Sequence, residues 1–170
     1  IELGTYMIAG AITDGDIKLT GGNGALLENF IEKLYGIGIK IDQCKDYLRV
    51  KRVKSSSIKS TNIITEPFPG FPTDLQAQLM VLMTQAKGVS KIKENIFENR
   101  FMHVPELKRM GAKIEIQNKI AYIFGPSKLT GAEVMATDLR ASVSLVLAGL
   151  IADNRTIVNR ICLLYTSDAA

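Results

Sequence analysis

Hydrophobic positions in this chain follow two periods, one helical and one extended. Residues 75–86 carry an apolar residue every three or four positions, which predicts a helix with one apolar stripe. The stripe consists of Leu75, Leu79, Leu82, Met83 and Ala86. Residues 113–117 alternate polar with apolar side chains, and Ile120, Tyr122 and Phe124 recur at every second position, so we expect two strands there. Gln117-Asn118-Lys119 between them is typical of a hairpin turn.

The same order of elements occurs twice, 73 residues apart. Residues 15–18 close one helical pattern and open a strand, as residues 88–91 do. The segment 38–42 is echoed in the same way by 111–115, and Gly111 is the natural end of a short helix before it. A third copy begins at Thr137. Its predicted helix carries the stripe Leu139, Val143, Val146, Leu147 and Leu150, and a strand is expected at Thr156 to Val158.

This alternation of helices and strands in tandem copies predicts an α/β or α+β fold built of repeated units. Residues 145–151 are apolar almost all round, and a helix of that kind has no solvent face. We therefore expect residues 1–161 to form one compact lobe with helices buried and sheets outside.

The composition is that of an ordinary globular protein, with 46% hydrophobic and 22% charged residues. The longest apolar stretch, 143–152, is about half a bilayer span, so we expect no membrane association. The N-terminus has no signal-peptide pattern, and the chain is expected to begin partway through a gene product. Cys44 and Cys162 suit a reducing cytosol, which predicts a cytoplasmic protein.

Two scattered cysteines and one histidine make a zinc site improbable, and no metal or cofactor is expected. The net charge is +4, and its densest basic cluster is Lys45 to Lys59. That cluster offers only Tyr47 for stacking, so we interpret it as a solvated hairpin rather than a nucleic-acid site. Residues 21–24 are glycine-rich, but no Lys-Ser/Thr follows, which favours a strand-to-helix turn over a phosphate loop.

Three polar clusters interrupt the apolar pattern. In the first, residues 66–74, three prolines and a glycine form a stiff loop that delivers Asp74 to the first turn of a helix. Asp74 could simply complement the helix dipole. Thr73 with Gln76 already forms a predicted capping box, however, and an ordinary cap does not need a rigid loop.

The second cluster, residues 97–103, follows a predicted strand. Arg100 lies between two aromatic residues, either as a surface partner of Glu98 or as a fixed guanidinium that grips a carboxylate or phosphate. His103 is interpreted as a structural hydrogen-bonding residue. In the third cluster, 137–142, Asp138 is placed as a helix cap.

Arg140 follows Asp138 at the N-terminal end of the predicted buried helix, where a cation is unfavourable against the helix dipole. It therefore needs an anionic partner, either a carboxylate or a ligand. One aspartate suited to be a base and two arginines suited to hold an anion indicate a transferase or lyase. The substrate would be phosphorylated or carboxylated, and the residues alone do not choose between these.

Three segments resemble the UDP-N-acetylglucosamine enolpyruvyl transferase family, within the EPSP synthase superfamily. They are residues 67–78, 97–107 and 135–142 with the Leu-Ala-Gly that follows. The likeness runs nearly unbroken from Ile1 to about Ile161. It implies one lobe of an inside-out α/β barrel, made of three βαβαββ units with the third unit incomplete. The shikimate-type enolpyruvyl transferase shares that fold, but its motifs are less similar.

The resemblance implies transfer of enolpyruvate from phosphoenolpyruvate to the 3-hydroxyl of UDP-N-acetylglucosamine, in peptidoglycan synthesis. Asp74 matches the aspartate held to deprotonate that hydroxyl, and Asp138 a second active-site aspartate. Ile96 matches a position whose backbone contacts the nucleotide sugar. Arg100 and Arg140 match arginines on the phosphoenolpyruvate side of the cleft.

The family's reactive cysteine belongs to another lobe, and neither Cys44 nor Cys162 has a matching context. We thus expect an incomplete enzyme that is inactive without its second lobe, and a non-native tail at residues 162–170. The alternatives are a shikimate-type transferase and a non-catalytic module that binds a nucleotide sugar.

Overall fold

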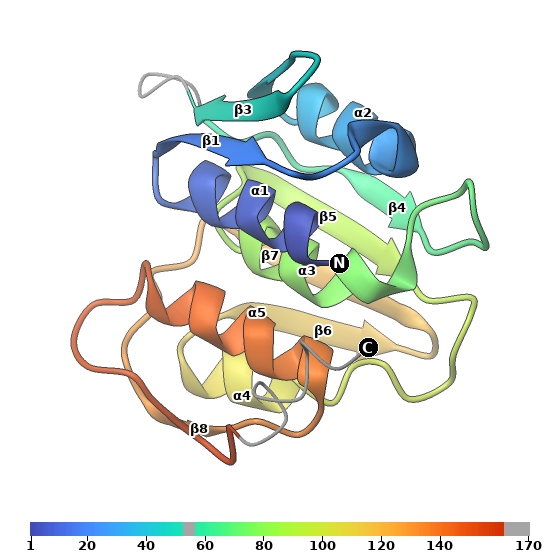
Figure 1. Ribbon diagram of the computed structural model, residues 1–170. Coiled ribbons are helices and arrows are strands. Elements are labelled where there is room, and N and C mark those ends of the chain that lie inside the picture. The colour runs from blue at the N-terminus through green and yellow to red at the C-terminus, as the bar shows by residue number, and fades with distance from the viewer. Residues whose placement is uncertain (53–56, 162–170) are drawn as a thin grey trace.

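The computed structural model describes residues 1–52 and 57–161 (Figure 1). The first repeat contains α1 (Glu2–Ile12), β1 (Asp16–Thr20), the 3-10 helix η1 (Gly24–Leu27), α2 (Glu28–Gly36), β2 (Ile39–Gln43) and β3 (Tyr47–Arg52). The second contains β4 (Asn62–Ile64), the 3-10 helix η2 (Thr73–Leu75), α3 (Gln76–Met83), β5 (Gly88–Lys93), α4 (Val104–Arg109), β6 (Lys113–Gln117) and β7 (Ile120–Gly125). The third contains β8 (Glu133–Met135), α5 (Leu139–Gly149) and β9 (Ile157–Asn159).

The strands form three sheets, in the orders β1-β3-β2, β4-β5-β7-β6 and β8-β9. β4 pairs with β5 in parallel, as β8 does with β9, and the other pairs are antiparallel. Helix α3 contacts β5 and β7 on one side, and α1 and α5 on another, as Figure 1 shows. The mixed α/β fold with helices packed inside the sheets is confirmed, although the described strands do not close into one barrel.

Helix α3 is the centre of the core. All eight of its residues are buried, including the amides of Gln76 and Gln78. The predicted stripe is therefore correct but too narrow, because neighbouring helices cover the remaining faces as well. Gln78 Nε2 donates to Thr5 Oγ1 of α1 at 3.3 Å, which gives one of these buried amides a partner.

The 73-residue repeat is confirmed. β7 begins and ends 73 residues after β3, and the hydrogen-bonded pair Gln78 and Thr5 also has this separation. Gly38 and Gly111 hold equivalent positions after α2 and α4, and both have φ of +97°, a backbone conformation that other residues rarely adopt. The predicted hairpin between β6 and β7 is also present, with Asn118 at its turn.

The predicted apolar stripe of α5 is wrong in part. Val146 and Leu150 are 40% and 57% exposed, while Ser142 and Ser144 are buried with Leu145. Ser142 can be buried because its hydroxyl donates to the Asp138 carbonyl one turn earlier, which leaves no unpaired polar group. The helix thus has an exposed face after all, and that face is apolar.

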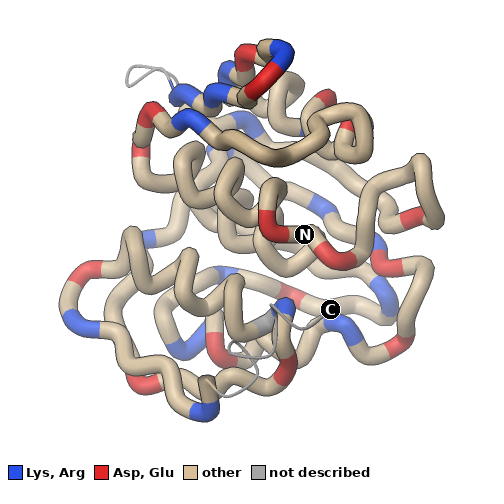
Figure 2. Tube along the Cα trace, in the orientation of Figure 1, with Lys and Arg blue, Asp and Glu red and all other residues tan. Residues whose placement is uncertain are grey.

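The basic cluster lies partly on β3, where Asp16 of the neighbouring strand β1 compensates it. Asp16 bonds Arg49 at 2.6 Å and lies 3.3 Å from Lys51, and the Arg49 hydrogen bond above all holds the pKa of Asp16 down to about 2. Figure 2 shows basic and acidic positions interspersed along the chain. Among the described residues, no helix is long and apolar enough to cross a membrane. Residues 162–170, with Cys162 and the expected tail, lie outside the described ranges.

Candidate functional site

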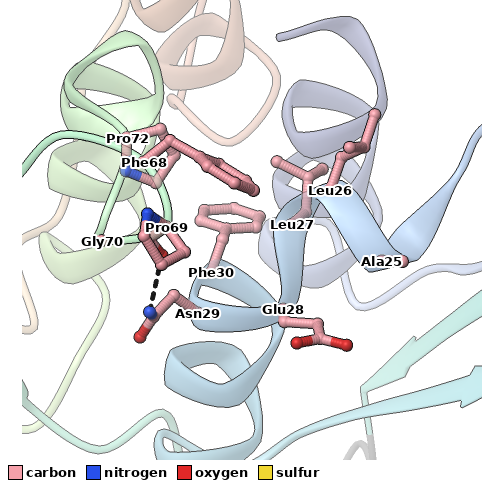
Figure 3. Close-up of a pocket in the computed structure, with 10 residues that line it drawn as sticks. All are labelled: Ala25, Leu26, Leu27, Glu28, Asn29, Phe30, Phe68, Pro69, Gly70 and Pro72. Atoms are coloured by element: carbon pink, nitrogen blue, oxygen red, sulfur yellow. Dashed lines mark hydrogen bonds between the residues drawn. The ribbon is translucent and has the colours of Figure 1, made fainter.

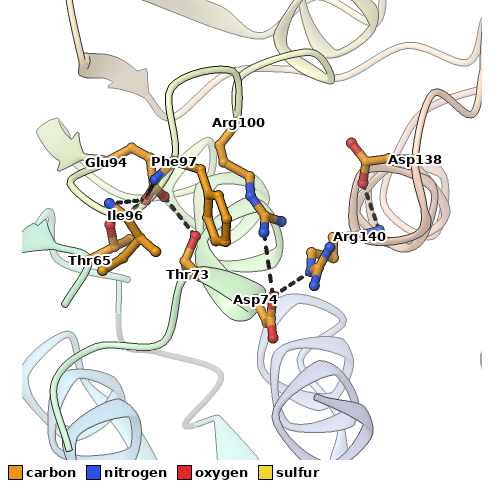
Figure 4. Close-up of polar contacts among 9 residues, drawn as sticks. All are labelled: Thr65, Thr73, Asp74, Glu94, Ile96, Phe97, Arg100, Asp138 and Arg140. Atoms are coloured by element: carbon orange, nitrogen blue, oxygen red, sulfur yellow. Dashed lines mark hydrogen bonds and ion pairs between the residues drawn. The ribbon is translucent and has the colours of Figure 1, made fainter. Parts of the chain in front are cut away.

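Asp74 lies on η2, at the end of the proline-rich loop, and its carboxylate faces two guanidinium groups (Figure 4). Its Oδ1 forms an ion pair with Arg140 Nε and lies 3.9 Å from Arg100 Nη2. The side chain is one-third exposed, so a ligand could reach it. The three residues that we expected to carry the chemistry, from three separate segments, are brought together.

The predicted capping box is wrong. Neither η2 nor α3 has a side-chain cap, because the Thr73 hydroxyl donates to Glu94 Oε2 at 2.9 Å. The Gln76 side chain is buried and does not reach back to the start of the helix. Neither Thr73 nor Asp74 caps the helix through its side chain, but Asp74 does lie in the first turn of η2, where its charge complements the helix dipole.

Arg100 is held by its surroundings. Its guanidinium lies 4.2 Å from the centre of the Phe97 ring, and only 15% of the side chain is exposed. Glu98 pairs instead with Lys119, whose Nζ lies 4.0 Å from Glu98 Oε1. The surface ion pair between Arg100 and Glu98 is therefore not formed. Stacking on an aromatic face fixes the plane of a guanidinium while leaving its N–H groups free to bind.

Asp138 and Arg140 begin α5. The Asp138 carboxylate accepts the Arg140 backbone N–H at 2.9 Å, as expected for a residue at a helix start. The anionic partner that Arg140 required is Asp74. This ion pair joins the second repeat to the third and offsets the unfavourable position of Arg140 against the helix dipole.

A small polar pocket lies among these groups. Its lining residues are Thr73, Gln76, Ala77, Arg100, His103, Asp138 and Arg140. Gln76 and His103 are both buried, and in the described part of the chain Gln76 Nε2 and His103 Nε2 have no hydrogen-bond partner. Three segments that are distant in sequence therefore share one polar cavity on which buried side chains and two arginines converge.

Burial lowers the pKa of His103 to about 4, an effect that the Asp138 charge and a hydrogen bond with the Arg100 backbone reduce only in part. His103 is therefore neutral at pH 7 in the folded chain. In the unfolded chain its pKa is about 6.5, so between roughly pH 6.5 and 4 the unfolded state binds more protons.

We accordingly expect His103 to reduce the free energy of unfolding as the pH falls through this window, by up to about 1.4 kcal/mol per pH unit. Above pH 6.5 this contribution is constant. Urea unfolding at pH 7, 5.5 and 4.5, compared with His103→Gln, measures it. The variant should have the flatter pH profile, and two parallel profiles would contradict the expectation.

Ile96 lies on the loop after β5, half-buried, and its backbone N–H donates to Glu94 Oε1 at 2.8 Å. Glu94 was missed in the sequence reasoning. A signal was available in the strand pattern, because Glu94 shares one face with Ser90 and the apolar Ile92; the structure buries all three. A carboxylate on the inward face of a strand needs several hydrogen-bond donors.

The proline-rich loop is anchored on the side away from the polar pocket. Asn29 Nδ2 of α2 donates to the Pro69 carbonyl at 2.7 Å, and the Phe30 and Phe71 ring centres are 5.7 Å apart. Figure 3 shows a second, mostly apolar pocket here, between the start of α2 and residues 68–72. These contacts fix the loop that delivers Asp74.

The profile of the EPSP synthase (3-phosphoshikimate 1-carboxyvinyltransferase) family matches residues 1–167. This chain belongs to the EPSP synthase family. Two curated relatives are UDP-N-acetylglucosamine 1-carboxyvinyltransferases. The one from Cereibacter sphaeroides strain KD131 is 56% identical over 161 residues, and the one from Magnetococcus marinus is 55% identical. Each match covers 95% of this chain and 38% of the relative's length.

Two solved structures agree with the fold. The enolpyruvyl transferase NikO from Streptomyces tendae matches 98% of this chain with a TM-score of 0.89 and 26% identity, over 39% of its own length. An EPSP synthase from Acinetobacter baumannii matches 91% of the chain with a TM-score of 0.64 and 18% identity, which supports the fold alone. The family match and the fold therefore agree, and the chain spans a little over one third of the length of these relatives.

Proposed function

We propose that this chain forms about one lobe of a UDP-N-acetylglucosamine enolpyruvyl transferase, a cytoplasmic enzyme of peptidoglycan synthesis. The whole enzyme would move enolpyruvate from phosphoenolpyruvate to the 3-hydroxyl of UDP-N-acetylglucosamine and release phosphate. One observation carries the proposal: Asp74 faces Arg100 and Arg140 in a chain that is 56% identical to a relative named UDP-N-acetylglucosamine 1-carboxyvinyltransferase. The remaining length, with the second lobe, would complete the cleft.

In this reaction Asp74 acts as the base. The sugar hydroxyl oxygen forms a bond to the enol carbon of phosphoenolpyruvate, the bond from that carbon to the phosphate oxygen breaks, and the hydroxyl proton passes to Asp74. A carboxylate can accept that proton as the oxygen attacks. Arg100 and Arg140 stabilise negative charge on phosphoenolpyruvate and on the departing phosphate.

Before substrate binds, the same arginines hold the Asp74 carboxylate. An anionic substrate that takes over their N–H groups would leave Asp74 free to act as a base. Asp138 supports this arrangement, since it holds the backbone of Arg140 at the start of α5. We assign Ile96 to contact with the nucleotide sugar through its backbone.

The experiment is a chimera. The 161 aligned residues of this chain replace their counterparts in the Cereibacter sphaeroides relative, and phosphate release is measured with both substrates. We expect the chimera to be active and the 170-residue chain alone to release no phosphate, because groups from both lobes must orient two substrates.

Three outcomes would overturn or change the proposal. Phosphate release by the chain alone would show that the second lobe is dispensable. Activity of the chimera with shikimate 3-phosphate in place of the nucleotide sugar would indicate a shikimate-type transferase. A folded but inactive chimera, with UDP-N-acetylglucosamine bound by the chain alone, would indicate a non-catalytic binding module.

A further inference from the structure

Glu94 is a buried carboxylate that the proposed reaction does not use. It follows β5 directly, and only 1% of the residue is exposed. Its Oε1 accepts the Thr65 hydroxyl at 2.7 Å and the backbone N–H groups of Ile96 and Phe97 at 2.8 and 3.2 Å. Its Oε2 accepts the Thr73 hydroxyl at 2.9 Å (Figure 4).

These four hydrogen bonds explain how a carboxylate can be buried here. Removing a charge from water is costly unless hydrogen-bond donors replace the lost solvent. The donors come from three separate places: the end of β4, the start of η2 and the loop after β5. β4 and β5 run in parallel, with Ile64 opposite Lys93, so their carboxyl ends meet at the edge where Glu94 lies.

Three of these four contacts lead to a residue of the candidate site. Thr73 immediately precedes Asp74. Phe97, whose N–H is held by Glu94, carries Arg100 stacked on its ring. The Ile96 N–H donates to Glu94. The Ile96 carbonyl is therefore the backbone group that can accept a hydrogen bond from a sugar hydroxyl. Glu94 is thus the point at which the Asp74 segment and the Arg100 segment are joined.

We infer that Glu94 is a positioning residue. It fixes the segments of Asp74 and Arg100 relative to each other, and it orients the Ile96 carbonyl as an acceptor for the nucleotide sugar. It touches no reacting atom. Its effect on turnover rests on the proposed function, whereas its effect on the two loops does not. A shift of about 1 Å in a reacting group is enough to slow an enzyme substantially, so the bond to Thr73 matters for Asp74.

The variants are Glu94→Ala and Glu94→Gln, with Glu98→Ala and Glu98→Gln as matched controls. Glu98 lies on the same loop but its side chain is 87% exposed. In Glu94→Gln the side-chain oxygen can still accept the three hydrogen bonds that Oε1 accepts in the wild-type chain. The glutamine amide then meets Thr73, whose hydroxyl can turn to accept instead of donate. Alanine removes all four contacts.

The first measurement uses the 170-residue chain without substrate. Amide hydrogen exchange at Ile96 and Phe97 should accelerate by at least about tenfold in Glu94→Ala and stay protected in Glu94→Gln and both Glu98 variants. Unchanged protection in a folded Glu94→Ala chain would overturn the inference.

If Glu94→Ala does not fold, Thr73→Val replaces it. That change removes only the Oε2 bond, so Ile96 and Phe97 should stay protected. Exchange should instead accelerate at Leu75, whose N–H donates to the Pro72 carbonyl at 3.1 Å, and unchanged protection there would overturn the inference.

The second measurement uses the chimera. Glu94→Ala, or Thr73→Val in its place, should lower kcat by about tenfold at a temperature where the protein is fully folded, and Glu94→Gln should recover most of it. A folded Glu94→Ala chimera with faster exchange but unchanged kcat would reduce Glu94 to a structural residue and overturn its positioning role. A chimera that is inactive in every form would contradict the proposed function. The exchange data would still show whether Glu94 fixes the two loops.

Discussion

Replacing Asp74 with asparagine in the chimera should lower turnover by at least about a hundredfold, the usual scale for the loss of a general base. Asparagine cannot accept a proton at neutral pH, yet its carbonyl oxygen can still accept a hydrogen bond from Arg140. The fold should therefore survive. Asp74 is one-third exposed and lies outside the apolar core, which also argues for a small effect on stability.

The measurement is phosphate release at saturating concentrations of both substrates, with thermal unfolding of each protein alongside. Asp153→Asn is a suitable control, because Asp153 pairs with Lys128 at 2.9 Å on the exposed surface. That variant should retain wild-type turnover. Wild-type turnover in Asp74→Asn would remove Asp74 from the mechanism and leave it as an ion-pair partner for two arginines.

Leu145→Ala should destabilise the 170-residue chain by about 2–5 kcal/mol, whereas Val146→Ala should cost far less. The two positions are adjacent on α5, but Leu145 is fully buried and Val146 is 40% exposed. Truncating Leu145 removes buried apolar surface and leaves a cavity beside neighbours that relax only partly. Truncating Val146 opens no cavity, and alanine is the better helix former.

Urea unfolding at pH 7 measures both variants, and the midpoint should move strongly only for Leu145→Ala while the slope stays constant. Equal losses at both positions would mean that α5 is rotated from the orientation described, or that another part of the protein covers Val146.

Patterns confined to one segment predicted much of this fold. The turn at Asn118 and the helix end at Gly111 depend on local backbone preferences, so they can be derived from residue order. The 73-residue repeat can be read by comparing two segments of the sequence. The meeting of Asp74 with Arg140 could also be anticipated. A cation at the N-terminal end of a buried helix requires an anion, and equivalent positions in successive repeats lie on the same side of the fold.

Features that depend on contacts between distant segments could not be predicted from these patterns. Thr73 has the sequence of a helix cap, but its hydroxyl is taken by Glu94, which lies 21 residues away. The strand pattern places Glu94 on an inward face, but its partners Thr65 and Thr73 can be identified only once β4 and β5 are paired. The face that α5 buries was misjudged because Ser142 satisfies its hydroxyl within the helix, and this makes a serine compatible with the core.

The packing of α1, α3 and α5 has a consequence for how such a chain could have arisen. These helices hold equivalent places in the three repeats, and each contacts the other two. Thr5 and Gln78, which occupy the same position in two copies, bond each other across the contact. A single repeat would leave the apolar surface of its helix in water unless other copies covered it. In this chain the three helices cover one another as the subunits of an oligomer would, with the copies joined end to end.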